Sequence, residues 1–164
     1  MGIGLVAAAV LTASPADAAT TYGPYAFINN SSHLCMDVAY GSTADGGRIQ
    51  QWYCYGGTPE KWSMVKVKRI GVTDYFELVN QNSNKCLDVP GGNGTAGVLL
   101  QQWRCWGGDM QLWAVETQSA TQSARVKNLM TGMCLDNKDW SNSPGTSLQQ
   151  WPCNDLPPQQ WHLA

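Results

Sequence analysis

The chain has 164 residues, of which 43% are hydrophobic and only 13% are charged, and its formal net charge is −2. This length suits one domain with its own core, and the weak charge gives no basic patch that would indicate a nucleic-acid partner. The unusually frequent residue types are Gly, with 17 residues, and Trp, with 8. Glycine is typical of tight turns and tryptophan of flat apolar surfaces.

The first segment, residues 1–19, is interpreted as a secretory signal outside the folded domain. Ile3 to Leu11 is an apolar run too short to span a membrane, and Ala16-Asp17-Ala18 has the small-x-small pattern of a cleavage site. No Lys or Arg precedes the apolar run, so an alternative is that the true leader is longer. We expect the remaining chain, 20–164, to be a secreted, extracellular domain.

The rest of the chain contains one sequence pattern repeated three times, over approximately residues 25–66, 75–116 and 124–164. In each copy a Cys is followed two residues later by Asp, then by Gln-Gln-Trp, a second Cys and a second Trp. The aspartates are Asp37, Asp88 and Asp136, the first tryptophans are Trp52, Trp103 and Trp151, and the second tryptophans are Trp62, Trp113 and Trp161. The spacings do not change between copies. Such self-similarity predicts an architecture of three equivalent units.

Six cysteines fall into three pairs with the same separation, Cys35–Cys54, Cys86–Cys105 and Cys134–Cys153. No Cys-x-x-Cys is present, and the two histidines keep no spacing with the repeats, so a metal site is not expected. The constant spacing favours three disulfides within the repeats. Each would close a loop of roughly 20 residues and contribute on the order of 3 kcal/mol, in an oxidising compartment.

Short apolar–polar alternations bounded by Gly, Asn and Ser predict about four strands in each repeat. They are Tyr25–Asn29, Leu34–Val38, Ile49–Trp52 and Trp62–Lys66; Phe76–Asn80, Lys85–Val89, Leu99–Trp103 and Trp113–Glu116; then Arg125–Leu129, Met133–Asn137, Ser147–Trp151 and Trp161–Leu163. No segment holds a helical period, so the predicted class is all-β. Val65–Asp74 is expected to be an exposed hairpin and Thr117–Ser123 a surface loop. The Asn that ends each first strand is expected to cap a turn.

These residues resemble a known family. Three copies of Cys-x-Asp, Gln-x-Trp and a closing aromatic, over roughly Tyr25 to Leu163, are similar to the ricin-B-type lectins, including the carbohydrate-binding modules of actinobacterial xylan-degrading enzymes. The resemblance implies a β-trefoil of twelve strands with pseudo-threefold symmetry, and it implies that the second tryptophans are core residues. Repeats that bury their apolar sides against one another agree with that fold.

A sugar has hydroxyls at its rim and C–H groups on its faces, so a sugar site needs an acceptor beside an aromatic ring. By resemblance, Asp37/Trp52, Asp88/Trp103 and Asp136/Trp151 are the acceptor and platform of up to three shallow pockets, supported by Gln50, Gln101 and Gln149. Further contacts are expected from Tyr55, Trp106 and Asn154, and from Gln111 and Gln159. The alternative is that each Asp only accepts backbone N–H bonds and each Trp only packs.

The chain departs from the family in one contact that all three pockets share. The family usually places Asn seven residues after the platform, and the residues here are Pro59, Met110 and Pro158. Galactose specificity of the common kind is therefore not implied. Tyr55 and Trp106 widen the aromatic surface, which suits an extended polysaccharide more than one terminal hexose.

The first repeat has a departure of its own. Glu60 stands where Gln111 and Gln159 stand in the other repeats. An ionised Glu cannot donate to the nearby Asp, and two carboxylates repel. We therefore expect the first pocket to be the weakest and the second, with Trp106, to be the strongest.

The sequence thus predicts a non-catalytic, monomeric lectin module that binds carbohydrate of galactose type, xylose type or another polysaccharide. No cofactor, nucleic acid or membrane span is expected. The alternative is a β-trefoil protein-interaction or inhibitor module whose sugar sites are degenerate. No Ser/His/Asp grouping and no paired carboxylates outside the repeats indicate an enzyme. A single pocket is expected to bind at about millimolar strength, and several pockets on one polymer raise the avidity.

Overall fold

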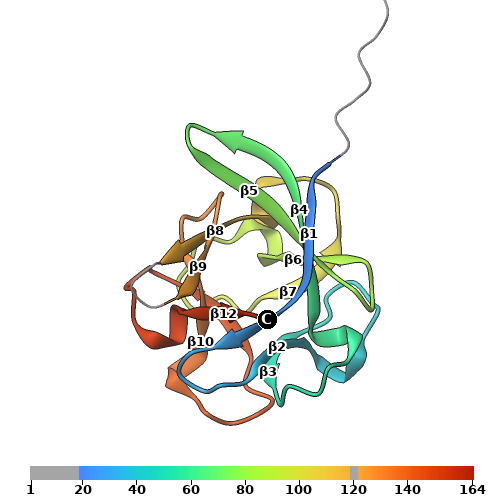
Figure 1. Ribbon diagram of the computed structural model, residues 1–164, viewed down its shortest axis with the longest axis vertical. Helices are drawn as coiled ribbons and strands as arrows, with labels where there is room; N and C mark the ends of the chain where they lie inside the picture. The colour runs from blue at the N-terminus through green and yellow to red at the C-terminus, as the bar shows by residue number, and fades with distance from the viewer. Residues whose placement is uncertain (1–18, 119–121) are drawn as a thin grey trace, which may run out of the picture.

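The computed structural model describes residues 19–118 and 122–164, and all its regular strands belong to one network (Figure 1). The proposed signal segment lies, except for residue 19, outside the described residues. The first repeat contains β1 (Thr21–Asn29), β2 (Cys35–Val38), β3 (Ile49–Trp52) and β4 (Lys61–Ile70). The second contains β5 (Thr73–Asn80), β6 (Lys85–Asp88), β7 (Gln101–Arg104) and β8 (Leu112–Gln118). The third contains β9 (Ser123–Asn128), β10 (Cys134–Asn137), β11 (Leu148–Trp151) and β12 (Trp161–Leu163).

All twelve predicted strands are found, and the all-β class is confirmed. Ile49–Trp52 and Trp161–Leu163 have the predicted bounds. The expected hairpin is longer than predicted because β4 and β5 remain paired from Trp62 to Ile70, and it reaches beyond the barrel in Figure 1. In each repeat, short 3-10 turns lie in the connections between the second and third strands and between the third and fourth strands. In the part of the chain that the structure describes, no helix is long and apolar enough to cross a membrane.

Six strands close into a barrel. β1 pairs with β4, β4 with β5, β5 with β8, β8 with β9, β9 with β12, and β12 with β1. Closure pairs each of these strands on both sides, which removes exposed sheet edges. The other six strands form one hairpin in each repeat, β2–β3, β6–β7 and β10–β11. This is the expected β-trefoil.

The second tryptophans fill the barrel interior, as predicted. Trp62, Trp113 and Trp161 are 0% exposed. Their indole N–H groups donate to backbone carbonyls of their own repeats, at 3.1 Å from Met36, 3.0 Å from Leu87 and 3.2 Å from Leu135. A buried indole needs such an acceptor, so each tryptophan joins its barrel strand to its hairpin in the same way.

The asparagines cap turns, as predicted, and they also join neighbouring repeats. The Asn80 side-chain oxygen accepts the backbone N–H groups of Asn82 and Ser83, at 3.0 and 3.3 Å. Its amide nitrogen donates to the carbonyl of Pro59, at 2.8 Å, in the preceding repeat. Asn29 and Asn128 make equivalent bonds.

A second set of buried amides holds the repeats together, and sequence reasoning missed it. These latch glutamines are the second Gln of each Gln-Gln-Trp, namely Gln51, Gln102 and Gln150. The Gln102 amide donates to the carbonyls of Ser42 and Ala44 in the first repeat, at 2.8 and 2.9 Å, and its oxygen accepts the Ser83 hydroxyl at 2.7 Å. Gln51 bonds the third repeat and Gln150 the second in the same manner. The latch therefore runs around the whole trefoil.

Candidate functional site

Each hairpin brings the predicted acceptor and the predicted platform together. In the first hairpin Asp37 lies opposite Gln50, and Cys35 lies opposite Trp52. The second and third hairpins have the same register. The three predicted disulfides are confirmed, with Cα–Cα distances of 5.1 to 5.2 Å, and each fixes the loop that follows the platform strand. As a result, each repeat has its own pocket, which is lined by the Asp, the Gln and the Trp of that repeat.

The three pockets share this floor and differ at the rim. The first, of about 440 Å³, adds Tyr40, Arg48 and Tyr55 to its lining. The second, of about 290 Å³, adds Trp106 and Met110. The third, of about 180 Å³, adds Trp140, Asn154 and Pro158. Every predicted site residue except Gln111 and Gln159 thus lines a pocket, and those two lie directly behind the aspartates.

The aspartates are held by side-chain amides. In the second pocket one oxygen of Asp88 accepts from the Gln101 amide at 2.7 Å, and the other accepts from the Gln111 amide at 3.0 Å. The third pocket repeats the pattern, with Gln149 at 2.8 Å and Gln159 at 3.1 Å from Asp136. The expected alternative, in which the Asp accepts backbone N–H groups, is absent from the hydrogen bonds of the described residues. The carboxylates are almost fully buried but still face the pocket.

This environment changes the acidity of the carboxylates. Burial raises the pKa of Asp37, Asp88 and Asp136 above the usual value for aspartate, and the glutamine hydrogen bonds partly oppose that rise. Burial dominates because water no longer solvates the charge fully. Additional donors, such as a pair of sugar hydroxyls, would therefore stabilise the charge of each carboxylate.

In the first pocket, Glu60 bonds the backbone and a different side chain donates to Asp37, which the sequence did not reveal. The Glu60 oxygens accept the backbone N–H groups of Tyr55 and Gly56, at 3.0 and 2.5 Å. The second oxygen of Asp37 instead accepts the Tyr55 hydroxyl at 3.2 Å. Burial, followed by the Asp37 charge, raises the pKa of Tyr55 to about 12, so the hydroxyl keeps its proton. The donor thought missing is present, and the low rank of this pocket stays only a prediction.

Arg48 is a further residue that the sequence analysis missed. Its guanidinium donates to the Gln50 side-chain oxygen at 2.9 Å and to the Gly145 carbonyl at 2.7 Å. The first bond orients the Gln50 amide so that it donates to Asp37, at 2.9 Å. The equivalent positions hold Leu99 and Ser147, so this control of the amide belongs to the first pocket.

The platforms are placed differently from the core tryptophans. Trp52 and Trp151 are 39% and 42% exposed, and Trp103 is partly exposed. Each is backed by a glycine turn of a neighbouring repeat. A Cβ at Gly145, where φ is +85°, would lie 3.5 Å from the Trp52 ring. Gly97 and Gly46 stand in the same way behind Trp151 and Trp103.

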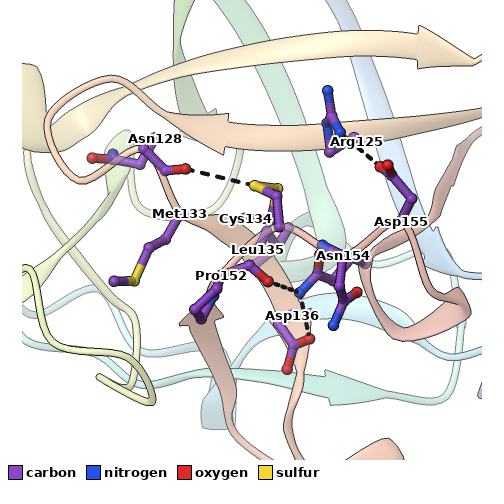
Figure 2. Close-up of a disulfide and its surroundings, with 12 residues drawn as sticks. Arg125, Asn128, Met133, Cys134, Leu135, Asp136, Pro152, Asn154 and Asp155 are labelled. Carbon is purple, nitrogen blue, oxygen red and sulfur yellow. Dashed lines mark hydrogen bonds and ion pairs between the residues drawn. A yellow bond between two sulfur atoms is a disulfide. The ribbon is translucent and has the colours of Figure 1, made fainter.

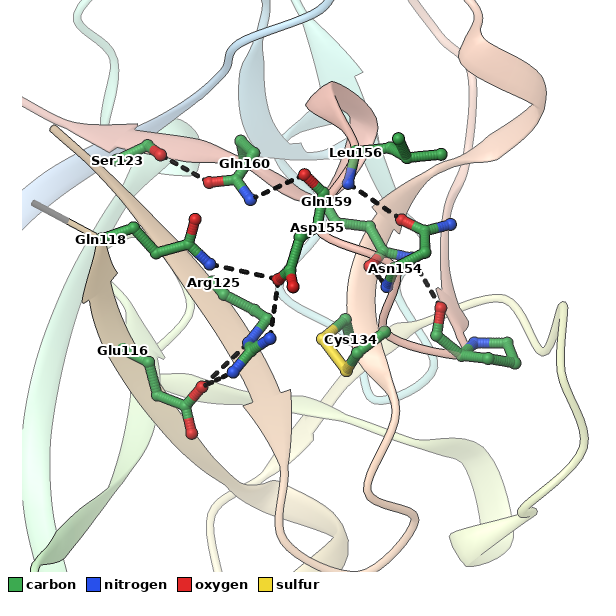
Figure 3. A network of polar contacts seen from close by, with 12 residues as sticks. Glu116, Gln118, Ser123, Arg125, Cys134, Asn154, Asp155, Leu156, Gln159 and Gln160 are labelled. Atoms are coloured by element: carbon green, nitrogen blue, oxygen red, sulfur yellow. Dashed lines mark hydrogen bonds and ion pairs between the residues drawn. A yellow bond between two sulfur atoms is a disulfide. The ribbon is translucent and has the colours of Figure 1, made fainter. Parts of the chain in front are cut away.

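The third pocket has a tethered rim. Figure 2 shows Asp136 and Asn154 close to the disulfide of that repeat. The following residue, Asp155, accepts from Arg125 at 2.7 Å and from Gln118 at 3.2 Å, as the network in Figure 3 shows. Arg125 also pairs with Glu116, at 2.5 Å. These bonds hold the rim loop against β8 and β9.

No metal chemistry is supported by the described residues. The one group of ligand-type atoms close enough together is Glu77 with Cys86 and Cys105. Those two sulfurs are bonded to each other, so neither offers the thiolate that a metal would need.

Comparisons with known proteins agree with this geometry. A family model described as ricin-type beta-trefoil lectin domain-like matches residues 16–73, 69–151 and 120–164. ThreeFoil, a designed threefold-symmetric protein, is 28% identical with a TM-score of 0.78, over 85% of this chain and 96% of that one.

Two natural proteins share the fold. The exo-beta-1,3-galactanase 1,3Gal43A from Clostridium thermocellum is 27% identical with a TM-score of 0.77, over 85% of this chain. The match spans only 29% of the galactanase. The C-half of an earthworm R-type lectin, solved in complex with GalNAc, has a TM-score of 0.65 over 85% of this chain and 95% of that one. At 12% identity it shows likeness of fold alone.

Proposed function

The chain belongs to the ricin-type beta-trefoil lectin domain-like family, and from that premise we propose that it is a secreted, non-catalytic module that binds polysaccharide. The observation that carries the proposal is the same in every repeat. A buried, amide-held Asp and a partly exposed Trp line one pocket on a disulfide-closed hairpin. The three disulfides also suit an extracellular setting.

The chemistry of the pocket matches that of a pyranose. The carboxylate accepts from two neighbouring hydroxyls, the glutamine behind it fixes the direction of its lone pairs, and the indole face covers a patch of C–H groups. A charge-assisted hydrogen bond is stronger than a neutral one. One shallow pocket of this kind is weak, at about millimolar, and three pockets on one polymer add avidity.

The ligand class follows from what the pockets keep and what they lack. Pro59, Met110 and Pro158 replace the amide that family members usually have, and Met110 and Pro158 line their pockets. Apolar groups at these positions favour contact with sugar faces over selection of a single hydroxyl. The galactanase that shares the fold is an exo-beta-1,3-galactanase, and the sequence motifs led us to expect modules of xylan-degrading enzymes as relatives. Xylan and beta-1,3-galactan are therefore the first ligands to test.

Affinity electrophoresis tests the proposal. The wild-type protein is expected to be retarded by soluble xylan or beta-1,3-galactan, or to be captured by another polymer in a panel with cellulose and chitin. The triple variant Trp52→Ala, Trp103→Ala, Trp151→Ala is expected to lose that retardation and still unfold cooperatively. If the wild type binds none of the polymers in the panel, the proposal is rejected in favour of a protein-interaction module.

A further inference from the structure

One short turn, present once in each repeat, differs between the three pockets. Turns η1 (Ala39–Gly41), η3 (Pro90–Gly92) and η5 (Lys138–Trp140) follow the strand that carries the Asp, and each has two successive residues in the left-handed region. The pairs are Tyr40 and Gly41, Gly91 and Gly92, and Asp139 and Trp140, with φ between +56° and +62°. The second repeat uses glycine twice, which adopts this conformation without steric cost. The first and third repeats place an aromatic residue there.

An aromatic residue in this conformation carries a steric cost that the fold does not offset. A left-handed backbone brings Cβ too close to a carbonyl oxygen, and bulky residues are uncommon there. Yet Tyr40 is 98% exposed and Trp140 is 53% exposed. Neither side chain enters the barrel core, and neither makes a side-chain hydrogen bond among the contacts of the described residues. Strained, exposed residues of this kind cluster at ligand sites.

Both aromatic rings line a pocket. Tyr40 lines the first pocket together with Asp37 and Trp52, and Trp140 lines the third together with Asp136 and Trp151. The second pocket has Gly91 at this side of its lining. We propose that Tyr40 and Trp140 are sugar-contacting residues, and that each adds affinity for polysaccharide to its own pocket. This inference rests on the proposed function and raises the expected rank of the first pocket, which then has three rings.

The ring pattern also indicates the form of the ligand. The first pocket receives Tyr40 from the turn on one side of its hairpin and Tyr55 from the loop on the other. Besides its platform tryptophan, the second pocket is lined by the loop aromatic, Trp106, and the third by the turn aromatic, Trp140. Several rings around one carboxylate suit linked pyranose units, each with an accessible C–H face, better than a single terminal sugar.

The second repeat offers a matched variant in the opposite direction. A Cβ at Gly91 would meet no atom within 4 Å, whereas one at Gly92 would lie 2.7 Å from the Met130 sulfur. The Cβ of Gly91→Tyr therefore lies in open space, at a φ of +59° that nearly equals the +58° of Tyr40. Tyr40→Gly and Trp140→Gly make the converse change.

The experiment compares wild type, Tyr40→Gly, Trp140→Gly and Gly91→Tyr by titration with soluble xylan and with beta-1,3-galactan, alongside thermal unfolding. Tyr40→Gly is expected to weaken binding about fivefold and to unfold at the same or a higher temperature, because the strain is removed. Trp140→Gly should also weaken binding, and Gly91→Tyr should strengthen it. A merely structural role would lower the unfolding temperature and leave binding unchanged.

Wild-type affinity in Tyr40→Gly would overturn the inference, as would unchanged binding by a folded Gly91→Tyr. If Gly91→Tyr does not fold, the two glycine variants decide. These results leave the proposed function standing, since the wild type still binds. If the wild type binds neither xylan nor beta-1,3-galactan, the same variants are compared on whichever polymer of the panel it does bind. Absence of wild-type binding to every polymer in the panel is the separate failure, and it removes the proposed function and this inference together.

Discussion

The core side of each repeat is nearly the same three times, whereas the pocket side differs each time. The core tryptophans are equally buried and donate to equivalent carbonyls, and the latch glutamines make equivalent bonds between repeats. The pockets range from about 180 to about 440 Å³ and carry different rims. Closure of the barrel requires three matching units, and nothing in closure constrains the rims. We infer that specificity lies in the rims.

The Gln-Gln-Trp motif contains residues of the core side and residues of the pocket side. Successive residues on a strand point to opposite faces, so Gln101 and Trp103 line the pocket while Gln102 lies buried between repeats. The repeated motif alone cannot separate these roles, because copies of one ancestral unit keep both. Mutations can separate them.

The largest effect is expected when a core tryptophan is compared with a platform tryptophan. Trp113→Ala removes a fully buried ring and should lower the free energy of unfolding by about 3–5 kcal/mol. Trp103→Ala should change stability far less and weaken polysaccharide binding. Chemical denaturation of both variants measures the difference. Equal destabilisation by the two changes would mean that the platform is structural.

Adjacent glutamines give the next largest contrast. Gln102→Ala leaves the carbonyls of Ser42 and Ala44 without their donor, and should cost about 1–3 kcal/mol of stability. Gln101→Ala loosens Asp88 and should act mainly on binding. Urea unfolding and affinity electrophoresis, applied to both variants, test this division. It is contradicted if Gln102→Ala leaves the urea midpoint unchanged.

The pocket carboxylates predict opposite effects of pH on binding and on stability. Since burial raises the pKa of Asp37, Asp88 and Asp136, they gain protons at a higher pH than exposed aspartates do. Binding should weaken as pH falls through that range, by about 1 kcal/mol per pocket, since a neutral acceptor makes weaker bonds.

Their contribution to folding has the other sign. A carboxyl group whose pKa is higher in the folded chain binds its proton more tightly there. The stabilisation is therefore fully present below the unfolded pKa and is lost as pH rises through the folded pKa. Titration of binding against pH, in wild type and in a triple Asp→Asn variant, isolates these groups. A wild-type binding profile with no acidic decline would contradict the assignment.

The smallest effect concerns the first pocket alone. Tyr55→Phe removes one donor to Asp37 and should weaken binding by about 0.5–1 kcal/mol. Adding Glu60→Gln supplies an amide like that of Gln111 and should restore part of the loss. Calorimetric titration of the single and double variants measures both steps. No loss in the single variant would show that the Tyr55 hydroxyl does not position Asp37.

The sequence predicted the fold well because triplication fixes the symmetry and constant cysteine spacing fixes the hairpins. It also identified the floor of each pocket. It missed the latch glutamines because their partners belong to another repeat, and it missed the role of Tyr55 because the hydroxyl reaches Asp37 only through the folded loop. Tyr40 and Trp140 were missed for a different reason. Only the backbone angles show the strain, although aligning the repeats would have set both beside glycines.

The most direct test of the account follows the tryptophan indole N–H signals by NMR during titration with xylan or beta-1,3-galactan fragments. The indole signals of Trp52, Trp103 and Trp151 are predicted to shift on binding, with that of Trp140, while the signals of Trp62, Trp113 and Trp161 stay in place. Binding that leaves every platform signal unmoved would contradict the claim that these pockets hold the sugar.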